Sequence, residues 1–382
     1  MNFCGPTNYQ MKITILQGAF LPVPPVLGGG VEKIWFALGK EFVRKGHKVT
    51  HISRNYEEFA SEEFIGGVHH LRVRGYDTPR SMAVTKWRDL LYTRRAAKLL
   101  PEADILVTNT FWAPLLSRDS RNGKICVHVA RYPKGQMRLY RAAARLHTVS
   151  QAVRDAICKE VPLMADSVRV IPNFVEGSSQ QVDSERKVAE ILYVGRIHPE
   201  KGTHLLLKAF TRLVDEGLRT WKLRIVGPWE VKLGGGGEHY FNSLRKETER
   251  LGPRIVWNGP VFDTSELRSL YQQSTIFVYP SLAERGETFG LAPLEAMGEG
   301  CPPIVSSLEC FQDFVTSGQN GWIFNHRSSD AENNLAYAIR DAINNKVHLS
   351  VIRANAFRTA QEFSLSNIAG RYLSDFEQLV AR

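Results

Sequence analysis

The chain has 382 residues, of which 43% are apolar and 23% charged; these are ordinary values for a folded protein with two domains or one large one. No stretch approaches the roughly 20 consecutive apolar residues of a membrane-spanning helix, which argues against that class. The net charge of +10 is uneven: residues 1–180 contain 26 Lys+Arg and 15 Asp+Glu, a balance of +11, and residues 181–382 contain 23 and 24, a balance of −1. The excess indicates either an anionic partner, such as a membrane surface, a phosphorylated lipid or a nucleic acid, or a solvated face without a partner.

The five cysteines form no Cys-x-x-Cys pair, and their number is odd. In a chain of this length we interpret them as reduced thiols of the cytoplasm and not as a disulfide framework. We therefore expect a cytoplasmic protein, with peripheral attachment to the inner face of the membrane as a further option.

The N-terminal half begins with the pattern of a strand–helix–strand unit. Residues 11–17 are apolar and predict a buried strand, and a Pro/Gly-rich loop follows. Ile34, Leu38 and Phe42 recur at helical spacing, so residues 31–45 predict a helix. The later strands of this half are expected at 48–53, 103–108, 124–129 and 167–172.

The polar segment 177–187 predicts an interdomain linker, and a second alternating series follows it. Its strands are expected at 189–194, 222–226, 254–257, 276–279 and 303–306, and its helices at 204–216, 239–250, 265–272, 291–297 and beyond 330. Two such series in tandem predict an α/β protein with two doubly wound parallel sheets. The expected division is 1–176, linker 177–187, 188–365, and a C-terminal helix at 366–382 that packs back on the N-terminal domain.

Two carboxylates, Glu287 and Glu295, are separated by seven residues. The first lies in a Gly-bracketed loop, and the second in the opening of a predicted helix. The backbone of Phe289, Gly290 and Leu291 is therefore expected at a helix N-terminus, where free N–H groups and the helix dipole favour anions. A carboxylate beside such a site is suited to accept hydrogen bonds from hydroxyl groups of the same ligand. A ligand with phosphates between two polyol rings is a nucleotide sugar.

Arg196 and Lys201 follow the end of one predicted strand and precede a helix. Arginine binds phosphate oxygens in pairs, and lysine adds a point charge. The same two residues could form ordinary surface ion pairs, but the carboxylates downstream favour a phosphate-binding role.

With these motifs the chain resembles the retaining GT-B glycosyltransferases of group 1, or family 4. The resemblance covers nearly the whole chain from Met11. Four features carry it, in order: Gly28-Gly29-Gly30-Val-Glu-Lys33 with Lys45-Gly-His-Lys-Val49, Val194-Gly-Arg-Ile-His-Pro-Glu-Lys-Gly202, Tyr279-Pro-Ser281, and the Glu287-to-Glu295 motif. It implies two Rossmann-like domains facing a cleft, with a nucleotide sugar on the C-terminal domain and a glycan or lipid-linked acceptor on the N-terminal domain. It also implies front-side attack, with the departing diphosphate helping to take the acceptor proton.

The resemblance further implies roles for single residues. Arg196 and Lys201 clamp the donor diphosphate, Glu295 binds the ribose, and Glu287 faces the donor sugar as a catalytic residue. The loop before Glu287 is longer here than in many relatives and holds a competing carboxylate, Glu284. The seven-residue spacing to Glu295 selects Glu287.

Two further positions of the N-terminal half carry expectations from the resemblance. Gly29 and Gly30 would let the backbone approach the donor, although an ordinary turn would also use glycine here. His128 ends a predicted strand and is expected near the donor sugar as a second catalytic residue. A histidine at a strand end is otherwise commonly a core residue.

Basic residues in this half suggest a surface for an anionic membrane or a lipid diphosphate acceptor. Four cations recur at spacings of 4, 3 and 4 and would form one stripe on a helix: Lys134, Arg138, Arg141 and Arg145. The segment 80–100 is also basic and partly amphipathic, with Trp87 within it. A solvated face without a partner is the alternative. Nucleic acid is not expected, because the stripe lacks interleaved aromatic residues.

No cofactor or metal is expected. The sequence has no Asp-x-Asp or His-Glu-x-x-His pattern, so cationic side chains are expected to neutralise the diphosphate. The run Gly234–Gly237 predicts a mobile loop, either a lid or a plain insertion. The resulting hypothesis is a metal-independent, retaining glycosyltransferase of surface polysaccharide, lipopolysaccharide or glycolipid synthesis. The alternatives are a sugar-nucleotide epimerase or other enzyme of the same architecture, and a non-catalytic glycan- or nucleotide-binding protein.

Overall fold

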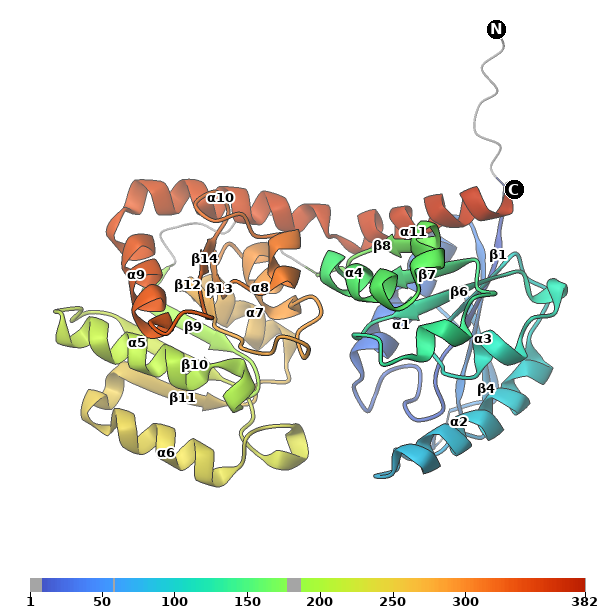
Figure 1. Ribbon diagram of the computed structural model, residues 1–382, viewed down its shortest axis with the longest axis horizontal. Helices are drawn as coiled ribbons and strands as arrows, with labels where there is room; N and C mark the ends of the chain where they lie inside the picture. Colours follow the sequence, from blue (N-terminus) through green and yellow to red (C-terminus); the bar gives the residue numbers. More distant parts are fainter. Residues whose placement is uncertain (1–8, 58, 177–186, 382) are drawn as a thin grey trace, which may run out of the picture. The chain divides into compact units, whose positions relative to one another are not determined.

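The computed structural model describes residues 9–57, 59–176 and 187–381, which divide into two compact units (Figure 1). Unit 1 comprises Met1–Phe174 with Leu365–Arg382, and unit 2 comprises Val175–Ser364. The linker expected at 177–187 lies outside the described residues apart from Lys187.

Unit 1 is built on an eight-stranded sheet in the order β3-β4-β2-β1-β5-β6-β7-β8. Only β3, at the edge, runs antiparallel, because it forms a hairpin with β4. The strands are β1 (Lys12–Leu16), β2 (Lys48–Arg54), β3 (Glu62–Ile65), β4 (Val68–Val73), β5 (Ile105–Thr108), β6 (Lys124–Val129), β7 (Arg145–Thr148) and β8 (Val168–Val170). The strand order reverses between β1 and β5, and the glycine-rich loop follows β1 at that point.

The helices of unit 1 pack apolar stripes against this sheet. They are α1 (Gly30–Arg44), α2 (Met82–Ala96), α3 (Ala113–Leu116), α4 (Gln151–Glu160) and α11 (Leu365–Val380). The C-terminal helix α11 packs against α1, and aromatic side chains of both helices are buried together there: Trp35, Phe42, Tyr372 and Phe376. The last segment of the chain is therefore part of the core of unit 1.

Unit 2 is built on a six-stranded parallel sheet in the order β11-β10-β9-β12-β13-β14. Its strands are β9 (Val188–Val194), β10 (Lys222–Val226), β11 (Ile255–Gly259), β12 (Ser274–Tyr279), β13 (Pro303–Ser306) and β14 (Trp322–Phe324). Its helices are α5 (Thr203–Asp215), α6 (Glu238–Thr248), α7 (Thr264–Gln273), α8 (Leu291–Gly298), α9 (Ala331–Asn344) and α10 (Lys346–Glu362). The order reverses between β9 and β12, so the loops after these two strands leave the same sheet edge.

These sheets confirm the predicted α/β class with two Rossmann-like parallel sheets. The hairpin of β3 and β4 and the short strands β7 and β14 were not predicted from the sequence. β7 and β14 are short, with four and three residues.

The prediction that Lys134, Arg138, Arg141 and Arg145 form one stripe on a helix is wrong. The segment contains only a short 3-10 turn, Gln136–Leu139, and the preceding Gly135 adopts a left-handed φ of 93° that ends any regular helix there. Arg145 is the first residue of β7 and is buried, with its Nε 3.0 Å from Asp375 Oδ1. The four cations thus belong to a loop, a turn and a strand, and the buried Arg145 does not share a surface with the other three.

Candidate active site

The candidate site of unit 2 lies at the reversal of strand order between β9 and β12. Arg196 follows β9, and Lys201 ends a 3-10 turn (Pro199–Lys201) just before α5. The loop with Glu287 follows β12 and leads into α8. Ligands of doubly wound sheets bind at such an edge, because the carboxyl ends of the strands and the helix N-termini meet there.

Lys201 and Glu287 form a buried ion pair at the centre of this edge. Lys201 Nζ lies 2.7 Å from Glu287 Oε2, and the two side chains are only 7% and 11% exposed. The same oxygen accepts hydrogen bonds from Tyr279 Oη and Ser281 Oγ, each at 3.2 Å. Burial, and then the nearby Glu287 carboxylate, raise the pKa of Tyr279 well above its usual value, so its hydroxyl remains a donor. Three donors therefore fix one oxygen of Glu287.

Arg196 lies beside this pair and is more open to solvent, with 42% of its side chain exposed. Its guanidinium donates to Glu200 Oε1 at 2.8 Å and to the Gly234 carbonyl at 2.9 Å. Its own carbonyl accepts the Tyr193 hydroxyl at 2.8 Å, which anchors the backbone. The Arg196 guanidinium is thus held by two acceptors, the Glu200 carboxylate and the Gly234 carbonyl, which the oxygens of an incoming phosphate can replace.

The glycine run 234–237, predicted as a mobile loop, has defined backbone partners. The N–H groups of all four glycines donate to carbonyls, of Val231, Glu230, Ile197 and Trp229 in turn. A Cβ on Gly235 would lie 2.2 Å from the backbone of Trp229, and one on Gly234 would lie 3.0 Å from the Arg196 side chain. The run is a tight turn whose lack of side chains lets it close around Arg196.

Glu284, the competing carboxylate, faces other partners. It pairs with Arg327 through both oxygens at 2.8 Å and accepts a 3.0 Å contact from His326 Nε2. Glu284 therefore ties the loop to the segment after β14, while Glu287 meets Lys201.

Helix α8 opens beside the ion pair. Its N-cap, Gly290, has a φ of 89°, and a Cβ there would lie 2.4 Å from the Phe311 ring, so no other residue fits. Leu291 is the first helical residue, and the buried Phe289 ring packs 5.4 Å from Phe314. Glu295 lies one turn on and accepts the Tyr271 hydroxyl at 3.2 Å. The whole set Arg196, Lys201, Glu287, Phe289, Gly290, Leu291 and Glu295 thus occupies one edge of one sheet.

The glycines expected to face the donor lie in unit 1. Gly29 is the N-cap of α1 with a φ of 97°, and a Cβ on it would lie 2.3 Å from Glu32 Oε2. Gly30 is the first residue of α1. Glu32 is buried in the first turn of the helix, and burial raises the pKa of its carboxyl. The loop therefore needs glycine for local packing as well as for any ligand.

His128 is a core residue of unit 1. It is buried on β6, edge-on to Trp35 at 5.4 Å, and its Nδ1 lies 3.5 Å from the Tyr372 hydroxyl. Burial, and then the neighbouring His147, lower the pKa of His128 to about 3. The ring is thus neutral near pH 7, and proton uptake by it is disfavoured.

The sequence analysis named the charged residues that meet at this candidate site, but not the neutral groups around them. Tyr279 and Ser281 were noted only as a motif, and the roles of Tyr271 and Gly234 were missed. The signal for Tyr279 and Ser281 was their place directly at the end of β12, where side chains reach the sheet edge.

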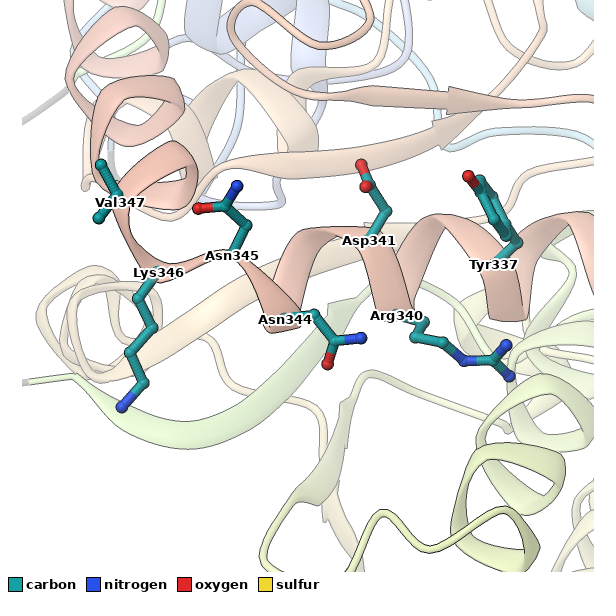
Figure 2. A pocket seen from close by; sticks show the side chains of 7 residues that line it. All are labelled: Tyr337, Arg340, Asp341, Asn344, Asn345, Lys346 and Val347. Carbon is teal, nitrogen blue, oxygen red and sulfur yellow. The ribbon is translucent and has the colours of Figure 1, made fainter.

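A pocket of about 560 Å³ lies elsewhere on unit 2, around the end of α9 and the start of α10 (Figure 2). Figure 2 shows Asp341 and Arg340 pointing to different sides of α9. Asp341 accepts the Trp322 indole N–H at 2.8 Å, and Arg340 pairs with Glu216. These charges serve to pack α9, and none of the predicted site residues lines this pocket.

The described residues contain neither a metal-ligand cluster nor a membrane-spanning helix. Within residues 9–57, 59–176 and 187–381, no three His, Cys, Asp or Glu side chains are grouped as metal ligands would be. None of the helices described there combines the length and the apolar character needed to span a bilayer.

The chain matches two family models, which together span residues 28–359. The model described as glycosyl transferases group 1 matches residues 175–359, and the glycosyltransferase family 4 model matches residues 28–178. The spore coat protein SA of Bacillus subtilis is 24% identical over 403 residues, covering 96% of this chain and all of the relative. The O-antigen chain mannosyltransferase of Salmonella typhimurium is 28% identical over 173 residues, 45% of this chain and 44% of the relative.

Solved structures share the fold. Sucrose-phosphate synthase from Thermosynechococcus elongatus aligns with a TM-score of 0.77 at 19% identity, over 97% of this chain and 100% of that one. Anabaena HepE, solved in complex with UDP and glucose, aligns with a TM-score of 0.71 at 16% identity over the same shares. The chain therefore belongs to the group 1, family 4 glycosyltransferases, nucleotide-sugar-dependent enzymes of the GT-B fold.

Proposed function

We propose that this enzyme is a retaining, metal-independent glycosyltransferase that moves a sugar from a nucleoside diphosphate sugar to an acceptor hydroxyl. The observation that carries the proposal is the convergence of Lys201, Tyr279 and Ser281 on one oxygen of Glu287 at the sheet edge. A carboxylate held in this way can accept hydrogen bonds from sugar hydroxyl groups through its other oxygen. It can also stabilise the positive charge that develops on the sugar as the diphosphate departs.

The cations beside it suit the leaving group. Lys201 has three N–H donors and Arg196 a planar fork, so both can bind phosphate oxygens and neutralise the charge that grows during bond cleavage. The open end of α8 adds the N–H groups of Leu291 and the next residue to the same region. Glu295, one turn along α8, would then accept hydrogen bonds from the ribose.

Unit 1 would contribute the acceptor side. Gly29 and Gly30 would allow a close approach of backbone to the donor. His128 remains a prediction: because its pKa is lowered to about 3, we expect it to act as a neutral hydrogen-bonding group and not as a proton donor. In this scheme the departing diphosphate takes the acceptor proton as the new glycosidic bond forms.

The acceptor proposed here is a precursor of surface polysaccharide, lipopolysaccharide or a glycolipid, at the cytoplasmic face of the membrane. Support comes from the Salmonella typhimurium O-antigen chain mannosyltransferase among the relatives. The excess of Lys and Arg over Asp and Glu in this chain also suits acceptors that carry phosphate.

A thermal-shift screen of UDP, GDP, ADP and dTDP tests the donor site, since a ligand that binds only the folded state raises its stability by RT ln(1 + [L]/Kd). We expect one nucleotide to raise the Tm of the wild type and to have no effect on Lys201→Ala. NMR of the product from that nucleotide's sugar should show the donor's anomeric configuration, with the same rate in EDTA. Equal shifts of both proteins would refute the site, and an inverted product or loss of activity in EDTA would refute the chemistry.

A further inference from the structure

A hollow of about 560 Å³ lies on unit 2 at the joint between helices α9 and α10, and Figure 2 labels the residues that line it. We term it the α9–α10 pocket (the labelled residues, from Tyr337 to Val347). Asn345 separates the two helices with a φ of −111° and a ψ of 88°, outside the helical region, so the chain bends there. Side chains of both helices therefore border one hollow, whose volume lies in the range of small-ligand sites, roughly 300–1,000 Å³.

The charged side chains on α9 that line this pocket have partners inside unit 2. Asp341 Oδ2 accepts the indole N–H of the buried Trp322 at 2.8 Å, and Arg340 forms an ion pair with Glu216. These contacts hold both side chains in place, and the two opposite charges offset each other. They leave Lys346 as a cation that is exposed and has no ion pair among the described residues.

The neutral side chains of the pocket, in contrast, are open to solvent. Tyr337 is 69% exposed and Val347 78%. Within the described residues neither the Tyr337 hydroxyl nor the Asn344 amide has a hydrogen-bond partner, and the two residues lie about two turns apart on the same side of α9. Asn345 uses its Oδ1 to accept the His348 N–H at 3.0 Å, which leaves its NH2 group available. The pocket thus offers a ring face, an aliphatic side chain and several unoccupied donors and acceptors.

We propose that the α9–α10 pocket binds a neutral glycan, at a place separate from the site of sugar transfer. A pyranose ring has a face of mainly C–H groups, which suits the exposed ring of Tyr337 and the side chain of Val347. Its hydroxyl groups both donate and accept hydrogen bonds, as does the amide of Asn344. A phosphate would face the carboxylate of Asp341, and a wholly apolar ligand would leave the amides without partners.

Such a site gives a glycan acceptor or product a second contact with the enzyme. Two linked contacts on one sugar chain raise its affinity above that of either contact alone, because the second binding step is intramolecular. Glycan binding in this pocket does not depend on which nucleotide carries the donor sugar.

Saturation-transfer difference NMR of the full chain tests the proposal with neutral trisaccharides: maltotriose, cellotriose, mannotriose and triacetylchitotriose. We expect at least one of them to bind the wild type, with the strongest transfer to its ring C–H protons. Tyr337→Ser should weaken this binding about tenfold or more, because truncation of an aromatic anchor removes most of its contact. Asn344→Ala should weaken it about 2- to 12-fold through the loss of hydrogen bonds. Tyr337→Phe should keep most of the affinity, since it keeps the ring.

Matched controls change exposed residues of the same kinds in other places, and Tyr9→Ser and Asn242→Ala should bind the trisaccharide as the wild type does. Thermal unfolding checks that every variant is folded, and the nucleotide-induced rise in Tm, which reports on the donor site, should be equal in all of them. The proposal is overturned if no trisaccharide binds the wild type. It is also overturned if Tyr337→Ser and Asn344→Ala bind as the wild type does, which is expected of a glycan held only at the site of transfer. A wild-type dimer in sedimentation that Tyr337→Ser separates into monomers would assign the pocket to a second copy of the chain instead.

Discussion

Lys201 Nζ and Glu287 Oε2 lie 2.7 Å apart in a nearly buried pair, so the cation proposed for the diphosphate is held by the carboxylate proposed for the sugar. In low dielectric each charge depends on the other, and the pair keeps both side chains in place before a donor binds. A diphosphate that approaches Lys201 would share its three N–H groups, and Glu287 would keep the donors Tyr279 and Ser281.

The first prediction separates these two residues. Lys201→Ala should lose the nucleotide-induced rise in Tm, and should also unfold at a lower temperature, because Glu287 is left buried without its cation. Glu287→Gln should keep the nucleotide-induced rise, since it faces the sugar, but lose about 100-fold or more in kcat. Thermal shift and initial-rate kinetics on both variants measure this. A Glu287→Gln variant with wild-type kcat would remove Glu287 from the chemistry.

A second prediction concerns the hydroxyl groups that orient Glu287. Tyr279→Phe removes one of the three donors to Oε2 without emptying its buried site. One such hydrogen bond contributes about 0.5–1.5 kcal/mol, so kcat should fall about 2- to 12-fold, with the KM for the donor unchanged. The control is Tyr337→Phe, which changes an exposed tyrosine. A rise in KM with constant kcat would instead mean that Tyr279 binds the donor directly.

A third prediction compares the two carboxylates of the loop. Glu284 is paired with Arg327 and His326, so Glu284→Gln should loosen the loop and reduce kcat less than tenfold. Glu287→Gln should cost at least ten times more. Steady-state kinetics under identical conditions decide between them. If Glu284→Gln is the more damaging change, the seven-residue spacing has selected the wrong residue.

Much of this site follows from the sequence, because its charged residues lie at strand ends and helix starts, and these ends are encoded locally. The strand before Arg196 and the helix after Gly290 are both visible as short apolar patterns. The neutral partners were harder to predict, since whether the Tyr279 hydroxyl meets Glu287 depends on the path of the loop between them.

The prediction of a basic helical stripe was wrong for a physical reason. The spacing of charges alone cannot distinguish a helix from a strand and a turn. Arg145 is buried because it pairs with Asp375, which lies 230 positions later in the chain. The conformation of the glycine run was equally hidden, because glycine allows many backbone conformations, and the carbonyls that its N–H groups meet belong to Trp229 and Ile197 among others. Long-range partners of this kind leave no local pattern.

A fourth prediction follows from that correction. Asp375 Oδ2 accepts His147 Nε2 at 2.8 Å, and Asp375 Oδ1 accepts Arg145 Nε at 3.0 Å, all in buried surroundings. Asp375→Ala should lower the free energy of unfolding by about 3–5 kcal/mol, since it leaves a buried guanidinium unpaired. Glu377→Ala, an exposed change on the same helix, should have little effect. Urea unfolding of the two variants measures the difference.

A fifth prediction concerns acid stability. His51 on β2 and His70 on β4 are fully buried with their rings stacked 5.2 Å apart. Within the described residues none of their four ring nitrogens has a hydrogen-bond partner. Around them lie Arg72, which pairs with Glu63, and the Phe36 ring. Burial, and then the charge of Arg72, lower the pKa of His70 to about 4, and burial lowers the pKa of His51 well below its usual value.

The sign of the effect follows from these shifts. An unfolded histidine takes up a proton near pH 6.5, whereas the buried His70 ring stays neutral until about pH 4, so between these values the unfolded chain binds more protons. Stability should therefore fall as the pH drops from 7 to 4.5. His70→Phe keeps the ring but not the proton site, and should make the Tm fall less steeply over this range. His239→Phe, an exposed change, should leave the slope as it is. Parallel Tm curves for wild type and His70→Phe would show that the buried pair does not control acid stability.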